Sequence, residues 1–255
     1  MAKILVTNDD GVHSEGIKVL ADALRHLGDV TVVAPMQEAS AIGHALTLRR
    51  PLRIEPIAPK TFGIDGTPTD CVNLAISHII KEKPDLIVSG INKGWNLGDD
   101  VTYSGTVSAA MEGTLLGVAS MAVSQAEGDA AGFEAAGQVT RLVAARVLVE
   151  GLPAKTLLNV NVPRGEIRGI RLTRLGHRVY REKVVQEVDP RGRPYFWIGA
   201  GPPEWQEDEA SDIAAVHAGL ASVTPLHLDL THFGALGRMA EWEGSLNALL
   251  KKRAR

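Results

Sequence analysis

The sequence predicts an α/β fold: a mostly parallel sheet with helices on both faces, plus a protruding β-hairpin arm. Short apolar, β-branched segments alternate with helix-like segments through most of residues 1–165, a pattern typical of parallel strands joined by crossover helices. The alternation then ends, and residues 176–199 show two strand-like segments around a turn. With 255 residues and 45% hydrophobic content, the chain is long enough to bury a large core.

The opening residues predict a βαβ unit. Residues 3–7 form a short β-branched run, and Ser14 can cap a helix that places Ile17 and Leu24 on one face. Residues 29–34 then return as a buried strand. We therefore expect these strands to pair in parallel, with the helix packed across them.

The remaining core elements follow the same alternation. We expect strands at 85–89, 119–124 and 157–162, helices at 67–81, 104–116 and 133–149, irregular loops at 35–45 and 90–103, and an extended segment at 46–57. The helix start at Thr67 is well marked, because Pro68 can occupy the first turn and Asp70 adds an acidic residue there.

The protruding arm is predicted at residues 176–199, with Asp189-Pro190-Arg191-Gly192 as its turn. The arm region carries many of the aromatic residues of the chain, namely Tyr195, Phe196, Trp197 and nearby Trp205. A projecting apolar ribbon usually meets a partner surface, so we expect a homodimer or homotetramer formed through the arm. The alternative is a hairpin folded back on its own domain.

These patterns divide the chain into three parts. Residues 1–165 would form the core, residues 166–210 the extended arm, and residues 211–255 a C-terminal strand (222–226) and helix (240–250). The C-terminal part is expected to return to the core or to be swapped to a partner subunit.

Composition excludes several classes of protein. A net charge of -3 gives no general attraction to nucleic acid or anionic membranes. No leader opens the chain and no apolar run approaches the roughly 20 residues needed to cross a bilayer, so we expect a cytoplasmic protein. Cys71 is the only cysteine, which excludes an internal disulfide or a multi-thiolate zinc site.

The first candidate site is a pair of adjacent carboxylates, Asp9 and Asp10, at the end of the first predicted strand. Gly11 allows a tight turn that can bring both side chains to one point, where a divalent cation would relieve their repulsion. Ligands of open α/β sheets collect beyond the carboxyl ends of the strands. The alternative is an ordinary turn, since Asp and Gly are favoured turn residues.

Two further loops offer neutral oxygen ligands. Ser40 follows the apolar residues 32–35, and Asn92 follows the apolar residues 86–88. Together with the acidic pair they would form an all-oxygen site suited to one divalent cation per subunit, Mg²⁺ or Mn²⁺. Ser40 alone could equally be a turn or cap residue.

A phosphate-binding site is expected where the glycine-rich loop 90–103 meets the next helix. Ser104, Gly105 and Thr106 open that helix, so free N–H groups, the positive end of the helix dipole and two hydroxyl groups coincide. The alternative is an ordinary Ser/Thr helix cap.

Other polar residues in these loops are weaker candidates. Asp99 and Asp100 form a second acidic pair that could hold the metal, but they could also cap the following helix or orient Lys93. His13 and His44 lie in candidate loops and could act on a leaving group.

Taken together, several motifs closely resemble the SurE family of survival-protein nucleotidases, nearly end to end. The motifs are Asn8-Asp9-Asp10-Gly11; Gly66-Thr67-Pro68-Thr69-Asp70-Cys71; Ser89-Gly90-Ile91-Asn92 with Gly94 and Asn96-Leu97-Gly98-Asp99-Asp100; Tyr103-Ser104-Gly105-Thr106; Ser211-Asp212 with Ala215 and Gly219; and Ser222-Val223-Thr224-Pro225-Leu226 with Asp229 and Thr231.

The resemblance implies a Rossmann-like domain with a swapped, oligomer-forming arm. It also implies metal-dependent hydrolysis of nucleoside 5′- and 3′-monophosphates, with polyphosphate as a further substrate. The family's metal ligands fall on Asp9, Asp10, Ser40 and Asn92, its catalytic residues on Asp9 and Asp10, and its phosphate-contacting residues on Asn96, Ser104, Gly105 and Thr106.

One stretch departs from the family pattern, because many relatives have Arg-Ser-Gly where this chain has Ala39-Ser40-Ala41. That puts substrate preference, more than the reaction, in doubt. The nucleophile is left open between a metal-bound water, which we favour, and an Asp carboxylate. Two other classes remain as alternatives, a nucleoside N-glycosidic hydrolase and a non-catalytic nucleotide sensor.

Overall fold

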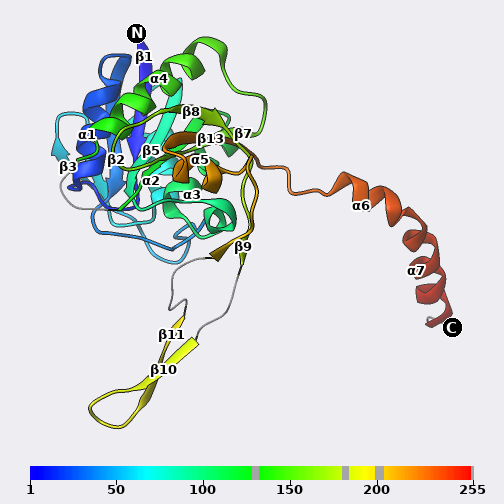
Figure 1. The fold of residues 1–255 in the computed structure, drawn as a ribbon. Helices are drawn as coiled ribbons and strands as arrows, with labels where there is room; N and C mark the ends of the chain where they lie inside the picture. Colours follow the sequence, from blue (N-terminus) through cyan, green and yellow to red (C-terminus); the bar gives the residue numbers. More distant parts are fainter. Residues whose placement is uncertain (128–131, 180–183, 199–203, 254–255) are drawn as a thin grey trace.

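The first strand, β1 (Ala2–Thr7), lies in the interior of a nine-stranded sheet in the computed structural model (Figure 1). The structure describes residues 1–127, 132–179, 184–198 and 204–253. The strand order is β3-β4-β2-β1-β5-β6-β7-β13-β8. The other strands are β2 (Gly28–Pro35), β3 (Ile54–Ala58), β4 (Thr61–Ile64), β5 (Leu86–Lys93), β6 (Ala119–Gln125), β7 (Thr156–Val162), β8 (Gly169–Leu172) and β13 (Leu220–His227).

Most neighbouring strands run parallel, as the alternation of elements predicted. The parallel pairs are β1·β2, β1·β5, β2·β4, β5·β6, β6·β7 and β8·β13. The exceptions are the antiparallel pairs β3·β4 and β7·β13. The α/β fold class is therefore confirmed.

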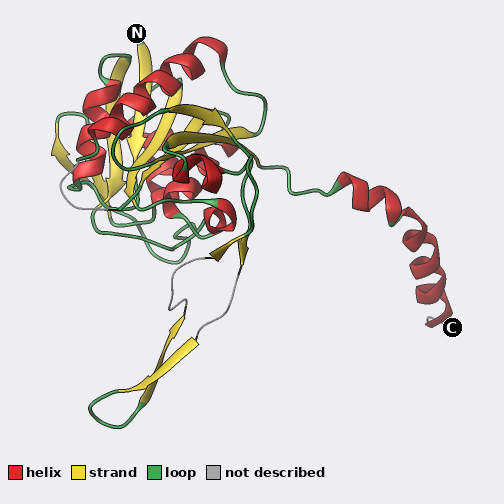
Figure 2. Cartoon of the chain, in the orientation of Figure 1, coloured by secondary structure: helices red, strands yellow, loops and turns green. Residues whose placement is uncertain are grey.

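Helices cover both faces of the sheet (Figure 2). They are α1 (Glu15–Leu24), α2 (Pro68–Leu74), α3 (Gly105–Leu115), α4 (Glu134–Glu150), α5 (Asp212–His217), α6 (Phe233–Arg238), α7 (Ala240–Arg253), the π-helix η1 (Ala75–Ile79) and the 3₁₀-helix η2 (Gly98–Thr102). Helices α1 and α4 pack together, as do α2 and α3. Successive side chains of β1 point to opposite faces of the sheet. Ile4 and Val6 pack in the core beneath α1 and α4, whereas Leu5 packs in the core beneath α2.

Three predicted elements differ from the structure. Strand β5 continues to Lys93, so the loop predicted at 90–103 begins only at Gly94, and η2 lies within it. Of the extended segment predicted at 46–57, only the part in β3 is a strand. In the part before β3, the main-chain N–H of Thr47 donates to the Asp70 carboxylate (2.9 Å) instead of to a neighbouring strand. The helix predicted at 67–81 begins as expected, with reciprocal capping bonds between Thr67 and Asp70, but its α-helical part ends at Leu74 and η1 follows. Strands β4 and β8 and helices η2, α5 and α6 were not predicted.

The protruding arm is present. Strands β10 (Val184–Val188) and β11 (Pro194–Ile198) pair antiparallel and lie well apart from the core (Figure 1). At the base of the arm, β9 (Arg178–Val179) pairs with β12 (Glu204–Trp205). The remaining parts of the predicted hairpin, residues 180–183 and 199, lie outside the described residues.

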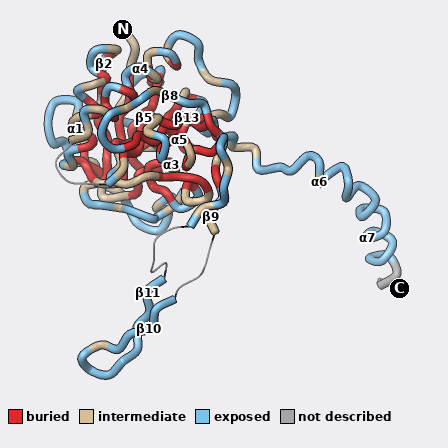
Figure 3. Tube along the Cα trace, viewed as in Figure 1, coloured by how far each residue is buried: buried red, intermediate tan, exposed pale blue. Residues whose placement is uncertain are grey.

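The C-terminal helices α6 and α7 extend away from the core, and their side chains are largely exposed (Figure 3). The terminal helix predicted at 240–250 is thus confirmed as a helix, but in this chain it does not pack on the sheet, so its exchange with a partner subunit remains a prediction. Within the described ranges, no helix combines the length and apolar character needed to cross a membrane.

Candidate functional site

Sheet order brings the three predicted loops together. Strand β1 lies between β2 and β5, so the loop with Asp9 and Asp10 is flanked by the loop that carries Ser40 and by Asn92 at the end of β5. These four residues line one cavity of about 650 Å³. The cavity lies beyond the carboxyl ends of the strands, where ligands of α/β sheets bind.

A side-chain turn shapes the acidic loop. The Asn8 amide donates to Gly11 O (3.1 Å) and to Ser14 Oγ (2.8 Å), and its Oδ1 accepts from the Gly11 N–H (3.1 Å). Gly11 has a φ of +98°, which favours glycine. Asn8 thereby locks the turn that carries both carboxylates into the cavity.

The Asp9 carboxylate lies against the N-terminus of α3. The Thr106 hydroxyl donates to its Oδ1 (2.5 Å), and the helix approaches so closely that a Cβ added to Gly105 would lie 2.8 Å from its Oδ2. Burial raises the pKa of Asp9 above its usual range, although hydrogen bonds from Thr106 oppose that rise. A buried carboxylate near a second one is a strong candidate for a cation ligand.

Asp10 is less buried than Asp9, and the negative charge of Asp9 disfavours its ionised form. Burial raises its pKa to about 6, the negative charge of Asp9 adds to that rise, and the Lys93 main-chain N–H, 3.3 Å from Asp10 Oδ2, lowers it. A divalent cation between Asp9 and Asp10 would offset the negative charge of Asp9 that adds to the rise in the pKa of Asp10.

Ser40 and Asn92 present neutral oxygen atoms to the same cavity. The Ser40 hydroxyl donates to Glu38 Oε1 (2.8 Å), which leaves the oxygen lone pairs for a cation. The Asn92 Nδ2 group donates to Gly94 O (2.8 Å), which leaves the amide oxygen for the cavity. A register shift in β5 between Ser89 and Asn92 redirects that side chain.

The donor set fits a hard cation. Among the described residues, no group of three or more His, Cys, Asp or Glu side chains is arranged for a metal. A cation would therefore depend on the two carboxylates together with the neutral oxygens of Ser40 and Asn92, which suits Mg²⁺ or Mn²⁺ better than zinc.

The predicted phosphate-contacting residues divide into two groups. Asn96 and Ser104 line the cavity. The Ser104 hydroxyl accepts from the Val107 N–H (3.1 Å) and keeps a hydrogen to donate. Thr106 is fully buried and its hydroxyl is committed to Asp9, so its side chain supports a carboxylate rather than facing the cavity. Gly105 has no side chain, which allows the N-terminus of α3 to lie close to the Asp9 carboxylate.

The second acidic pair holds the base of the arm. Asp99 Oδ2 accepts from the Arg178 main-chain N–H (2.9 Å), and Asp100 Oδ1 accepts from the Arg178 guanidinium (2.7 Å). His44 binds the buried Glu112 (2.7 Å). Neither His44 nor the exposed His13 is among the described residues that line the cavity.

Sequence reasoning missed several residues. Glu38, Lys93 and Arg178 also line the cavity. Asn159 and Asn161 are fully buried in β7 and bind the main chain of Asn96. Two asparagines two positions apart in an apolar strand were a visible signal, since buried amides need partners.

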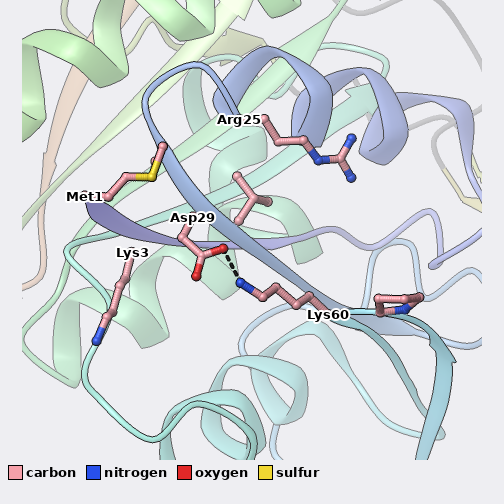
Figure 4. Close-up of a pocket in the computed structure, with 8 residues that line it drawn as sticks. Met1, Lys3, Arg25, Asp29 and Lys60 are labelled. Carbon is pink, nitrogen blue, oxygen red and sulfur yellow. Dashed lines mark hydrogen bonds and ion pairs between the residues drawn. The ribbon is translucent and has the colours of Figure 1, made fainter.

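Another cavity, of about 520 Å³, lies at the amino ends of β1 and β2 (Figure 4). It is lined by Met1, Lys3 and Gly28 from the beginnings of β1 and β2, and by Lys60 from the β3–β4 turn. The Lys60 ammonium there already pairs with Asp29. This cavity has no connection with the carboxylates at the carboxyl ends of the strands.

Comparison with known proteins identifies the family. Residues 4–182 match the family model of the survival protein SurE. The chain is 56% identical to the 5′-nucleotidase SurE of Syntrophotalea carbinolica (94% of this chain, 96% of the relative) and 53% identical to that of Geobacter sulfurreducens (94% and 93%). The crystal structure of the SurE protein from Aquifex aeolicus superposes with a TM-score of 0.86 at 46% identity, covering 94% of this chain and 99% of that one. The chain belongs to the SurE family.

Proposed function

We propose that this protein hydrolyses nucleoside 5′-monophosphates to nucleoside and phosphate, in a reaction that depends on one divalent cation per subunit. Relatives named 5′-nucleotidase are more than half identical over nearly the whole chain, which supports an enzyme of this class. The observation that carries the proposal is the meeting of Asp9, Asp10, Ser40 and Asn92 in one cavity beside the N-terminus of α3.

The cation would be Mg²⁺ or Mn²⁺, held by these four residues. When bound, it would neutralise negative charge on the phosphate as the ester bond breaks. Nucleoside 3′-monophosphates and polyphosphate are proposed as further substrates, because they present the same phosphoryl group to the cavity.

The residues of the chain bind and orient the phosphate. Ser104 would donate its hydroxyl hydrogen to a phosphate oxygen, and Asn96, which lines the same cavity, would contact another phosphate oxygen. Water is the preferred nucleophile. Asp9 is a poor nucleophile because Thr106 and the N-terminus of α3 hold its carboxylate in place.

We also propose that the arm forms a homodimer or homotetramer. On β11, Phe196 and Trp197 are 58% and 60% exposed, and such aromatic side chains favour protein interfaces. Exposed Trp242 and Leu246 on α7 support the exchange of that helix with a partner subunit.

The cytoplasmic location expected from the sequence remains a prediction.

A product assay tests the function. Purified protein is given AMP, GMP, CMP and UMP in 5′- and 3′-forms, with Mg²⁺, Mn²⁺ or chelator, and released phosphate and released base are measured separately. We expect phosphate release with metal and none with chelator. Released base would indicate a nucleoside hydrolase, and saturable nucleotide binding without any product would indicate a sensor; either result would contradict the proposal.

A further inference from the structure

The main chain of Asn96 is held by side chains of β7. Asn161 Oδ1 accepts from the Asn96 N–H (2.8 Å), and Asn161 Nδ2 donates to Asn96 O (3.0 Å). Asn159 Nδ2 donates to the same carbonyl oxygen (2.8 Å). A single loop residue is thus bound at both of its main-chain polar groups, as it would be by a neighbouring strand.

These two amides lie in the buried interior of the sheet, where Ser124 and Ser222 flank Asn161 and where Ala122 and Thr224 flank Asn159. Asn159 and Asn161 have no exposed surface, and Val160 between them, equally buried, faces the other side of the sheet. Burying an amide costs free energy unless its hydrogen bonds are satisfied. Asn161 uses both of its polar side-chain atoms on Asn96, and Asn159 uses its Nδ2 there, whereas Asn159 Oδ1 has no hydrogen-bond partner among the described residues. The bonds that these amides do make all go to Asn96, which indicates a role in holding the loop.

The held residue belongs to the candidate site. Asn96 lines the cavity, and its side-chain amide donates to Ser124 Oγ at the end of β6 (2.8 Å). The loop that carries it, between β5 and η2, has no strand pairing at this point. A little further on, the Gly98 N–H binds the buried Asp212 (2.9 Å). Buried side chains therefore set the position of this loop.

We propose that Asn161, assisted by Asn159, is a positioning residue for phosphoester hydrolysis. It fixes the Asn96 main chain and so sets where the Asn96 amide lies relative to Ser104 and to the predicted metal ligands. This inference rests on the proposed function. Asn161 does not contact substrate; it acts through Asn96, and a displacement of about 1 Å in such a site can reduce turnover about 100-fold.

The test compares Asn161→Leu and Asn161→Asp with Val160→Ala. The leucine variant loses both bonds to Asn96, the aspartate variant keeps the acceptor for the Asn96 N–H, and Val160→Ala perturbs the same strand on its other face. Steady-state kinetics with AMP, Mn²⁺ affinity by calorimetry and thermal unfolding are measured for each variant.

We expect kcat to fall at least about 20-fold for Asn161→Leu and less for Asn161→Asp. Mn²⁺ affinity should stay within about twofold, because the two bonds go to Asn96 and not to a predicted metal ligand. Val160→Ala should lose thermal stability but keep kcat within about twofold. Asn159→Ala, which removes one of two donors to Asn96 O, supplies a milder variant with a loss of about threefold to tenfold.

Three results would overturn the inference: an unchanged kcat in folded Asn161→Leu and Asn159→Ala proteins, an equal loss of kcat in Val160→Ala, or a parallel loss of Mn²⁺ binding. Failure of the proposed function looks different, because then wild-type protein would release no phosphate with any metal. The wild-type assay therefore separates the two.

Discussion

Among single residues, the adjacent carboxylates Asp9 and Asp10 matter most for the chemistry of this protein. Burial makes both reluctant to carry charge, yet Thr106 and the N-terminus of α3 favour the ionised form of Asp9. The ionised form of this pair of carboxylates is therefore disfavoured by its surroundings, and a bound dication would stabilise it. The chemistry of the site is thereby built into a short turn after β1.

The Thr106 hydroxyl should tune metal affinity. Thr106→Val removes the donor to Asp9, so the pKa of Asp9 should rise further and protons should compete better with the cation. We expect Mn²⁺ binding to weaken at least about 10-fold. Thr106→Ser keeps a hydroxyl and should restore most of the affinity. Calorimetric titration at constant pH measures both, and equal affinity in wild type and Thr106→Val would contradict this role.

The raised pKa of Asp10 makes the stability of the metal-free protein depend on pH. Its folded pKa is about 6 and its ordinary value is 3.8, so the folded state binds the proton more tightly between these values. Folding stability should therefore rise as pH falls from about 7 to about 4. Asp10→Asn removes this contribution.

The prediction is tested by thermal unfolding of wild type and Asp10→Asn in chelator from pH 4 to pH 8. The variant should be the more stable protein above about pH 6, and its advantage should vanish towards pH 4. A difference between the two proteins that stays constant across this range would show that Asp10 has no raised pKa.

At the scale of elements, the close approach of α3 to β1 is the feature on which the site depends. Gly105→Ala would place a methyl group 2.8 Å from the Asp9 carboxylate, so the helix or the carboxylate must move. We expect phosphate release to fall at least about 100-fold. The matched control is Gly237→Ala in α6, where an added Cβ meets nothing within 4 Å. Near-normal activity in Gly105→Ala would contradict the assigned role of this contact.

Elements with strong local signals were predictable from sequence. The cap at Thr67, the apolar face of α1 and the short strands of the core all followed from capping chemistry and periodicity. The segment 46–53 was not, because contacts remote in sequence, such as Thr47 to Asp70, decide its path. The same applies to the end of α2, where η1 replaces continued α-helix.

In the candidate site, too, some residues were predictable from local sequence signals and others were not. Asp9, Asp10 and Ser104 were visible because each sits next to a strand end or helix start. The turning of Thr106 towards Asp9, and the support of Asn96 by Asn161, depend on which strands are neighbours. Sequence spacing carries no information about that order until the sheet is known.

At the scale of the whole molecule, the arm and the terminal helices leave apolar side chains without cover on this chain (Figure 3). Trp197 lies on the arm with its ring edge-on to Tyr195, at 6.4 Å between centroids. We predict that Trp197→Glu shifts the protein to a smaller assembly, because a charge would have to be buried at the interface. Sedimentation velocity over a range of concentrations measures this.

The control for the arm is Val149→Ser, which changes an exposed apolar residue at the end of α4 and should leave the assembly unchanged. If Trp197→Glu and wild type sediment as the same species at every concentration, the arm is not the main contact between subunits.

The central claim is that three separate loops meet to bind one dication. Anomalous diffraction at the manganese edge, on crystals grown with Mn²⁺, tests it most directly. The account predicts one strong peak per chain, bounded by oxygen atoms of Asp9, Asp10, Ser40 and Asn92. A peak elsewhere, or none in this cavity at saturating Mn²⁺, would contradict it.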